Sequence, residues 1–78
     1  MRRRKVLTKA FGLALQDARA LADLTQERLA FKAGIHPTYL SQVERGVKSP
    51  TLDVVDALAR ALRVEANALI KAAEELGG

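Results

Sequence analysis

The sequence of 78 residues contains no cysteine, no tryptophan and only one histidine. The absence of cysteine excludes disulfide bonds and thiolate metal ligands, and one histidine alone cannot form a zinc site. A chain of this length forms one small domain, which buries only about 60–65% of the surface that its unfolded form exposes. We therefore expect a partner chain or very good helix packing to provide the missing stability.

Long apolar runs and the usual catalytic constellations are also missing. No apolar run reaches 18 residues, so no transmembrane helix is predicted. The basic start and the apolar stretch after it are similar to a signal peptide. Gln16, Asp17 and Arg19 interrupt that stretch, so we expect a helix of a cytoplasmic protein instead. Without a His–carboxylate set or a glycine-rich phosphate loop, we predict no enzyme activity, no cofactor and no metal.

The net charge of +4 favours a polyanionic partner, but the charge is unevenly distributed. Five of the 13 basic residues lie within residues 1–9, which hold no acidic residue, so the remaining chain carries −1. We predict that residues 1–6 are a basic N-terminal arm, which either contacts a nucleic acid or is a solvated tail. Within the remainder, residues 25–48 carry +2 and residues 49–78 carry −2.

Fourteen alanines and few β-branched runs predict an all-α fold of five helices. The first helix is expected over residues 7–22, where apolar residues recur at spacings of three and four: Leu7, Phe11, Ala14, Ala18, Leu21 and Ala22. The fifth is expected over residues 65–75. Helix starts are predicted at the capping residues Thr25 and Thr51 and at Pro37, and helix ends at Gly34 and Gly46.

The second and third helices are separated by a turn of a few residues. Ala30 is small where the two helices would cross, Gly34 follows four residues later, and Leu40 and Val43 would pack back on the second helix. Such a helix-turn-helix unit can present its second helix to the major groove of DNA. Any helical hairpin with a glycine turn would show similar spacing, so the spacing leaves both interpretations open.

The segment Leu24–Gly46, LTQERLAFKAGIHPTYLSQVERG, resembles the Cro/phage-repressor (XRE) family of helix-turn-helix regulators, and the resemblance covers about residues 7–71. It implies a five-helix lambda-repressor-like DNA-binding domain over residues 7–76. The family usually reads inverted-repeat operators as homodimers, with the recognition helix, residues 37–45, in the major groove. The short chain and its HPTYLSQVERG segment are similar to restriction–modification controller proteins.

The resemblance implies two sets of DNA-contacting residues. The base-reading positions are those on the outer side of the third helix: Pro37, Thr38, Tyr39, Ser41 and Gln42. Proline offers no side-chain hydrogen bond, so we expect Thr38, Ser41 and Gln42 to read the bases. The phosphate-contacting positions are Gln26 and His36, which match positions near the DNA backbone in the family. Arg45 and Lys48 follow the third helix and are also expected to contact phosphates, although both could instead be solvated surface residues. His36 has an alternative role as the N-cap of the third helix.

Two further groups have predicted structural roles. The resemblance pairs Arg19 with Glu44, which would hold the third helix against the first. The apolar residues of the fifth helix exceed what one small core plainly needs, which favours a dimer with residues 65–76 as its dimerisation helix. We expect Ala66, Ile70, Ala73 and Val54 at this interface, although all could belong to the core.

Two other functions remain open from the sequence. An antitoxin would bind its own operator and also a toxin protein, through the fifth helix or the tail. A pure protein-interaction module of the same fold would bind no DNA. A regulator of transcription could also contact RNA polymerase.

Overall fold

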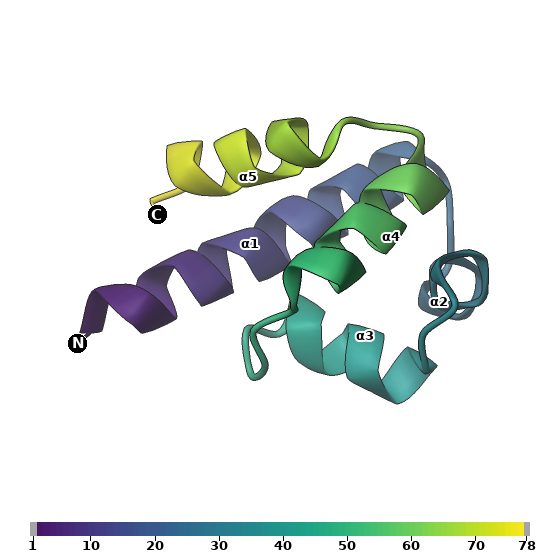
Figure 1. Ribbon diagram of the computed structural model, residues 1–78, viewed down its shortest axis with the longest axis horizontal. Coiled ribbons are helices and arrows are strands. Elements are labelled where there is room, and N and C mark those ends of the chain that lie inside the picture. Colours follow the sequence, from purple (N-terminus) through teal and green to yellow (C-terminus); the bar gives the residue numbers. More distant parts are fainter. Residues whose placement is uncertain (1, 78) are drawn as a thin grey trace.

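The computed structural model describes residues 2–77, and the side chains of residues 6–77, as five α-helices (Figure 1). The helices are α1 (Arg2–Leu21), α2 (Gln26–Ala33), α3 (Pro37–Glu44), α4 (Leu52–Leu62) and α5 (Ala66–Glu75). The long helix α1 packs against α5 on one side and against α3 on the other, while α2 contacts both α3 and α4. This architecture confirms the predicted all-α fold of five helices.

The first helix begins earlier than predicted. Its helical backbone starts at Arg2 rather than at Leu7 and continues without interruption to Leu21. Arginine and lysine are good helix formers, and residues 2–6 contain neither proline nor glycine. The predicted basic arm of residues 1–6 is therefore corrected: residues 2–6 form the N-terminal part of α1. Met1 lies outside the described residues.

The ends of α2, α3 and α4 follow from local chemistry, as predicted. The Thr25 and Thr51 hydroxyls accept hydrogen bonds from the backbone N–H groups of Arg28 and Val54, at 3.0 Å and 3.1 Å. Each bond satisfies an N–H group that has no partner within its helix. Gly34 ends α2 in the left-handed conformation, with a φ of 73° that costs glycine little.

The core lies between the inward faces of all five helices. Its fully or nearly buried apolar residues are Ala10, Phe11, Ala14, Leu15, Leu29, Ala30, Leu40, Val43, Val55, Leu58, Ala59, Leu62, Leu69 and Ala73. Leu21, which belongs to the apolar period expected in the first helix, is instead 89% exposed, and Leu52 is 86% exposed. Leu21 is the last residue of α1 and Leu52 the first of α4, so each extends beyond its helix's packed turns.

Two helices approach each other closely where α1 crosses the end of α3. A Cβ atom at Gly12 would be 2.5 Å from the Glu44 carbonyl oxygen and 2.6 Å from that of Val43. Just beyond α3, a Cβ atom at Gly46 would be 2.8 Å from Cγ of Lys9. Glycine at both positions therefore lets the C-terminal end of α3 lie directly on α1. Among the described residues, no helix has the length and apolar character needed to cross a bilayer.

Candidate nucleic-acid interface

Helix α3 is divided lengthwise into a buried and an accessible side. Leu40, Val43 and Glu44 are buried against the other helices. On the other side, Thr38 is exposed and the remaining predicted base-reading residues are half-buried: Pro37, Tyr39, Ser41 and Gln42. The aromatic ring of Tyr39 also packs against the edge of the core. The structure thus places five predicted base-reading residues on one short helix, with Thr38 the most accessible.

The N-terminal end of α3 is stabilised by its own flanking residues. His36 is the N-cap, and its Nδ1 accepts a hydrogen bond of 3.1 Å from the backbone N–H of Thr38. Pro37 occupies the first turn, where a missing N–H costs nothing. The alternative capping role of His36 is therefore present in the structure. The phosphate contact of His36 stays a prediction. Its side chain is exposed, as such a contact requires.

The C-terminal end of α3 carries the ion pair expected from the resemblance. Arg19 donates to both carboxylate oxygens of Glu44, through Nε at 2.7 Å and Nη2 at 3.1 Å. The carboxylate is only 3% exposed, so two parallel hydrogen bonds are needed to compensate for its lost hydration. The hydrogen bonds that Arg19 donates to Glu44, together with the negative charge of Glu44, hold the pKa of Arg19 above its ordinary value, although burial acts in the opposite direction.

Further hydrogen bonds to Glu44 were not predicted. The Gln26 amide nitrogen donates to Oε1 of Glu44 at 2.8 Å, and the Gln16 amide nitrogen donates to the Glu44 carbonyl oxygen at 2.8 Å. Arg19 also donates through Nη1 to the carbonyl oxygen of Leu24, at 2.9 Å. Glu44 therefore connects α1, the start of α2 and the end of α3. Sequence spacing cannot reveal such contacts, because the partners lie 18 to 28 positions apart.

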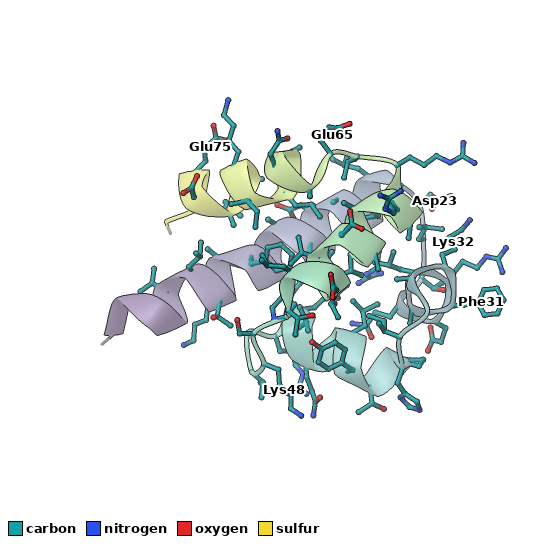
Figure 2. The ribbon with its side chains drawn as sticks, in the orientation of Figure 1. Asp23, Phe31, Lys32, Lys48, Glu65 and Glu75 are labelled. Atoms are coloured by element: carbon teal, nitrogen blue, oxygen red, sulfur yellow. The ribbon has the colours of Figure 1, made fainter. Side chains whose placement is uncertain are left out.

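The predicted basic residues Arg45 and Lys48 follow α3 and are exposed. The Nε of Arg45 lies 3.4 Å from the Ser41 hydroxyl oxygen, so the guanidinium group extends along α3. Figure 2 shows Lys48 at the edge of the molecule formed by α3, whereas Glu65 and Glu75 lie at the opposite edge with α5. The exposed positive charge near α3 and negative charge near α5 are thus separated across the fold.

The residues expected at a dimer interface do not all lie on the surface. Val54, Ala66 and Ile70 are half-buried, but Ala73 is 0% exposed within a single chain. The expectation for Ala73 is therefore wrong: this residue packs in the core between α5 and its neighbours. An open apolar groove of about 420 Å³ lies beside Ile70, where α1, α4 and α5 meet; it is lined by Leu7, Thr8, Phe11, Ser49, Pro50, Leu52, Val55 and Ile70.

The arrangement of α2 and α3 on a five-helix core defines a helix-turn-helix domain. The helix-turn-helix family model matches residues 15–69, and the chain belongs to this XRE-type family of DNA-binding transcriptional regulators. The control protein C.BamHI of Bacillus amyloliquefaciens is 34% identical over 61 residues, which cover 77% of this chain and 75% of that protein.

Other relatives support the same assignment. The crystal structure of the restriction–modification controller protein C.AhdI from Aeromonas hydrophila superposes with a TM-score of 0.76 at 40% identity, over 81% of this chain and 94% of that one. An uncharacterised HTH-type transcriptional regulator of Mycobacterium tuberculosis is 41% identical over 58 residues. Those residues are 74% of this chain, and they span only 41% of the length of the mycobacterial protein.

Proposed function

We propose that this chain regulates transcription as a homodimer that binds an inverted-repeat operator, with α3 of each subunit in the major groove. The observation that carries the proposal is the lengthwise division of α3. Its inner side is fixed to the rest of the domain by apolar packing and by the buried Glu44, while its polar outer side remains accessible. A helix held rigidly in this way can present side chains to base edges in a defined register.

The proposed base contacts follow from the chemistry of the outer side. The Gln42 amide carries a donor and an acceptor, which match N7 and N6 of adenine in the major groove. Thr38 offers a hydroxyl for hydrogen bonding and a methyl group for contact with thymine. Ser41 supplies a second hydroxyl, while Pro37 and Tyr39 provide apolar contact surface at the start of the helix.

The proposed phosphate contacts flank these residues along the chain. Gln26 lies at the start of α2, and Arg45 and Lys48 follow α3. His36 lies at the start of α3 and is exposed. Such contacts position the recognition helix on the duplex without reading its sequence. Release of counterions from the phosphates makes the affinity depend steeply on salt concentration.

The apolar groove beside α5 supports the dimer. Leu52 and Ile70 line this groove from α4 and α5, and the Leu52 side chain is 86% exposed in the single chain. Burial of large apolar side chains between two copies would stabilise a domain that is small and has no cysteine. A two-fold interface at this face would present two recognition helices. In the operator, the two half-sites that bind them would lie about 34 Å apart, which is one turn of DNA.

Selection of bound sequences from a random DNA pool tests the proposal directly. We expect the wild-type protein to enrich an inverted repeat, and the double variant Thr38→Ala, Gln42→Ala to lose the preference at defined positions while it remains folded. Binding of the enriched duplex and of a scrambled duplex, measured at several salt concentrations, separates specific from non-specific affinity. Failure of the wild-type protein to enrich any sequence would contradict the proposal.

A further inference from the structure

The carboxylate of Glu44 contacts a residue that is proposed to touch DNA. Its Oε1 accepts a hydrogen bond of 2.8 Å from Nε2 of Gln26, the first residue of α2. We infer that Glu44 is a positioning residue for DNA binding, which holds the Gln26 amide with its second N–H as the donor for a backbone phosphate. The inference rests on the DNA-binding function proposed above, and it gives the buried ion pair a role beyond stability.

The chemistry of the two side chains fixes the orientation of the Gln26 amide. An ionised carboxylate only accepts hydrogen bonds, so the amide must turn its NH₂ group, not its oxygen, toward Glu44. The same nitrogen carries two hydrogens, and one of them is used by Glu44. A phosphate is also an acceptor, so the second hydrogen, which Glu44 does not use, can be donated to it while the first holds the amide in place. In the opposite orientation, the amide oxygen would face Glu44 and repel it.

Glu44 can fix the amide because it is itself immobile. Arg19 binds both of its carboxylate oxygens, and the carboxylate is 3% exposed. Arg19 also donates to the carbonyl oxygen of Leu24, directly before the capping residue Thr25. The same pair thus holds both the turn that leads into α2 and the first side chain of α2. A side chain already ordered in the free protein loses less conformational entropy when it binds its ligand.

The state of the amide can be measured in the wild-type protein without DNA. In an NMR spectrum of the ¹⁵N-labelled protein, we expect one Gln26 side-chain amide proton to be shifted from its position in the unfolded chain and to exchange slowly with water. The second proton should shift when a 20-base-pair duplex of random sequence is added. A Gln26 amide with two protons at their unfolded positions would overturn the inference, and this measurement needs no variant to fold.

A double-mutant cycle then tests whether Glu44 acts through Gln26. Glu44→Gln keeps the shape of the side chain but offers one acceptor oxygen, which Arg19 competes for, so the Gln26 amide loses its fixed orientation. We expect Glu44→Gln to weaken binding of the random duplex about three- to tenfold in the wild-type background and less than about twofold in the Gln26→Ala background. Equal weakening in both backgrounds would show a purely structural role and overturn the inference.

Gln16→Ala is the matched control. It removes the hydrogen bond to the Glu44 carbonyl oxygen but leaves the carboxylate and its three hydrogen bonds in place. We expect this variant to lose stability and to keep the wild-type affinity at temperatures at which it is fully folded. If neither wild type nor any variant binds DNA, the proposed function fails. If Gln26→Ala weakens binding but the cycle shows no coupling, only the inference fails.

Discussion

Gly12 of α1 lies directly against the Glu44 carbonyl oxygen at the end of α3, and a Cβ atom at position 12 would be 2.5 Å from it. Alanine is normally preferred to glycine inside a helix by about 1 kcal/mol. Here we expect the opposite, because the added methyl group would push the backbone of α3 away from α1. Gly12→Ala should lower the free energy of unfolding by about 1–3 kcal/mol, as overpacking does elsewhere.

Urea denaturation followed by circular dichroism would measure this change. Ala20→Gly is a suitable control, because Ala20 is an exposed residue of the same helix. It should cost about 0.5–1 kcal/mol through helix propensity alone. A Gly12→Ala variant that is more stable than the wild type would show that α1 and α3 can separate without cost.

The buried and exposed ion pairs of the domain should differ strongly in their contribution to stability. Glu44→Ala removes the anchor of Arg19, Gln26 and the end of α3, and Arg19→Ala leaves the buried carboxylate without its cation. Each should lower the free energy of unfolding by about 3–5 kcal/mol, enough to unfold much of the protein. The measurement is thermal or urea denaturation of each variant.

The pair Asp56–Arg60 on α4 provides the comparison. Its Nε–Oδ2 distance is 3.0 Å, but both side chains are exposed. Asp56→Ala should therefore change stability by less than about 0.5 kcal/mol. A Glu44→Ala variant with the wild-type melting temperature would contradict the structural role of the buried pair, whether or not it still bound DNA.

Lys48 should contribute to DNA affinity without contributing to sequence preference. With a phosphate contact from each subunit of a dimer, Lys48→Ala should lower the slope of log affinity against log salt concentration by about 2. Fluorescence anisotropy with a labelled duplex measures this slope. Lys71→Ala makes the same charge change on α5, at the other side of the fold. An equal reduction of the slope in both variants would argue for a general charge effect.

The apolar groove between α1, α4 and α5 should control dimer formation. Leu52→Glu places a charge at an 86% exposed position of this groove, so the fold should tolerate it while the dimer dissociates. Sedimentation equilibrium should show a monomer at concentrations at which the wild type is a dimer. Leu21→Glu is the matched control, because Leu21 is 89% exposed at the end of α1 and does not line this groove. Dissociation by Leu21→Glu alone would place the interface elsewhere.

Features that depend on a few adjacent residues could be predicted from the sequence. Thr25, Gly34, Pro37 and Thr51 mark their helix ends because capping and backbone conformation are local properties. The apolar period places the start of α1 too late, because the basic residues before Leu7 have high helix propensity but no apolar period. Leu15 shows a missed signal: it lies four residues after Phe11 on the same helical face, and it is fully buried.

Features that depend on packing could be predicted only where the family resemblance supplied them. The Arg19–Glu44 pair was expected on that basis, but the hydrogen bonds from Gln26 and Gln16 were not. They require the ends of three helices to meet at one point, which no local pattern specifies. Ala73 was misplaced for a related reason, since periodicity identifies an apolar face but not which of its residues a neighbouring helix covers.

The division of α3 into two sides has an evolutionary consequence. Leu40, Val43 and Glu44 maintain the fold, whereas Thr38 and Gln42 lie outside the core. If Thr38 and Gln42 read bases as proposed, recognition of a new operator requires substitutions only at positions that contribute little to folding. Duplicated genes for such a domain can diverge in their targets within one cell while every copy keeps the same architecture.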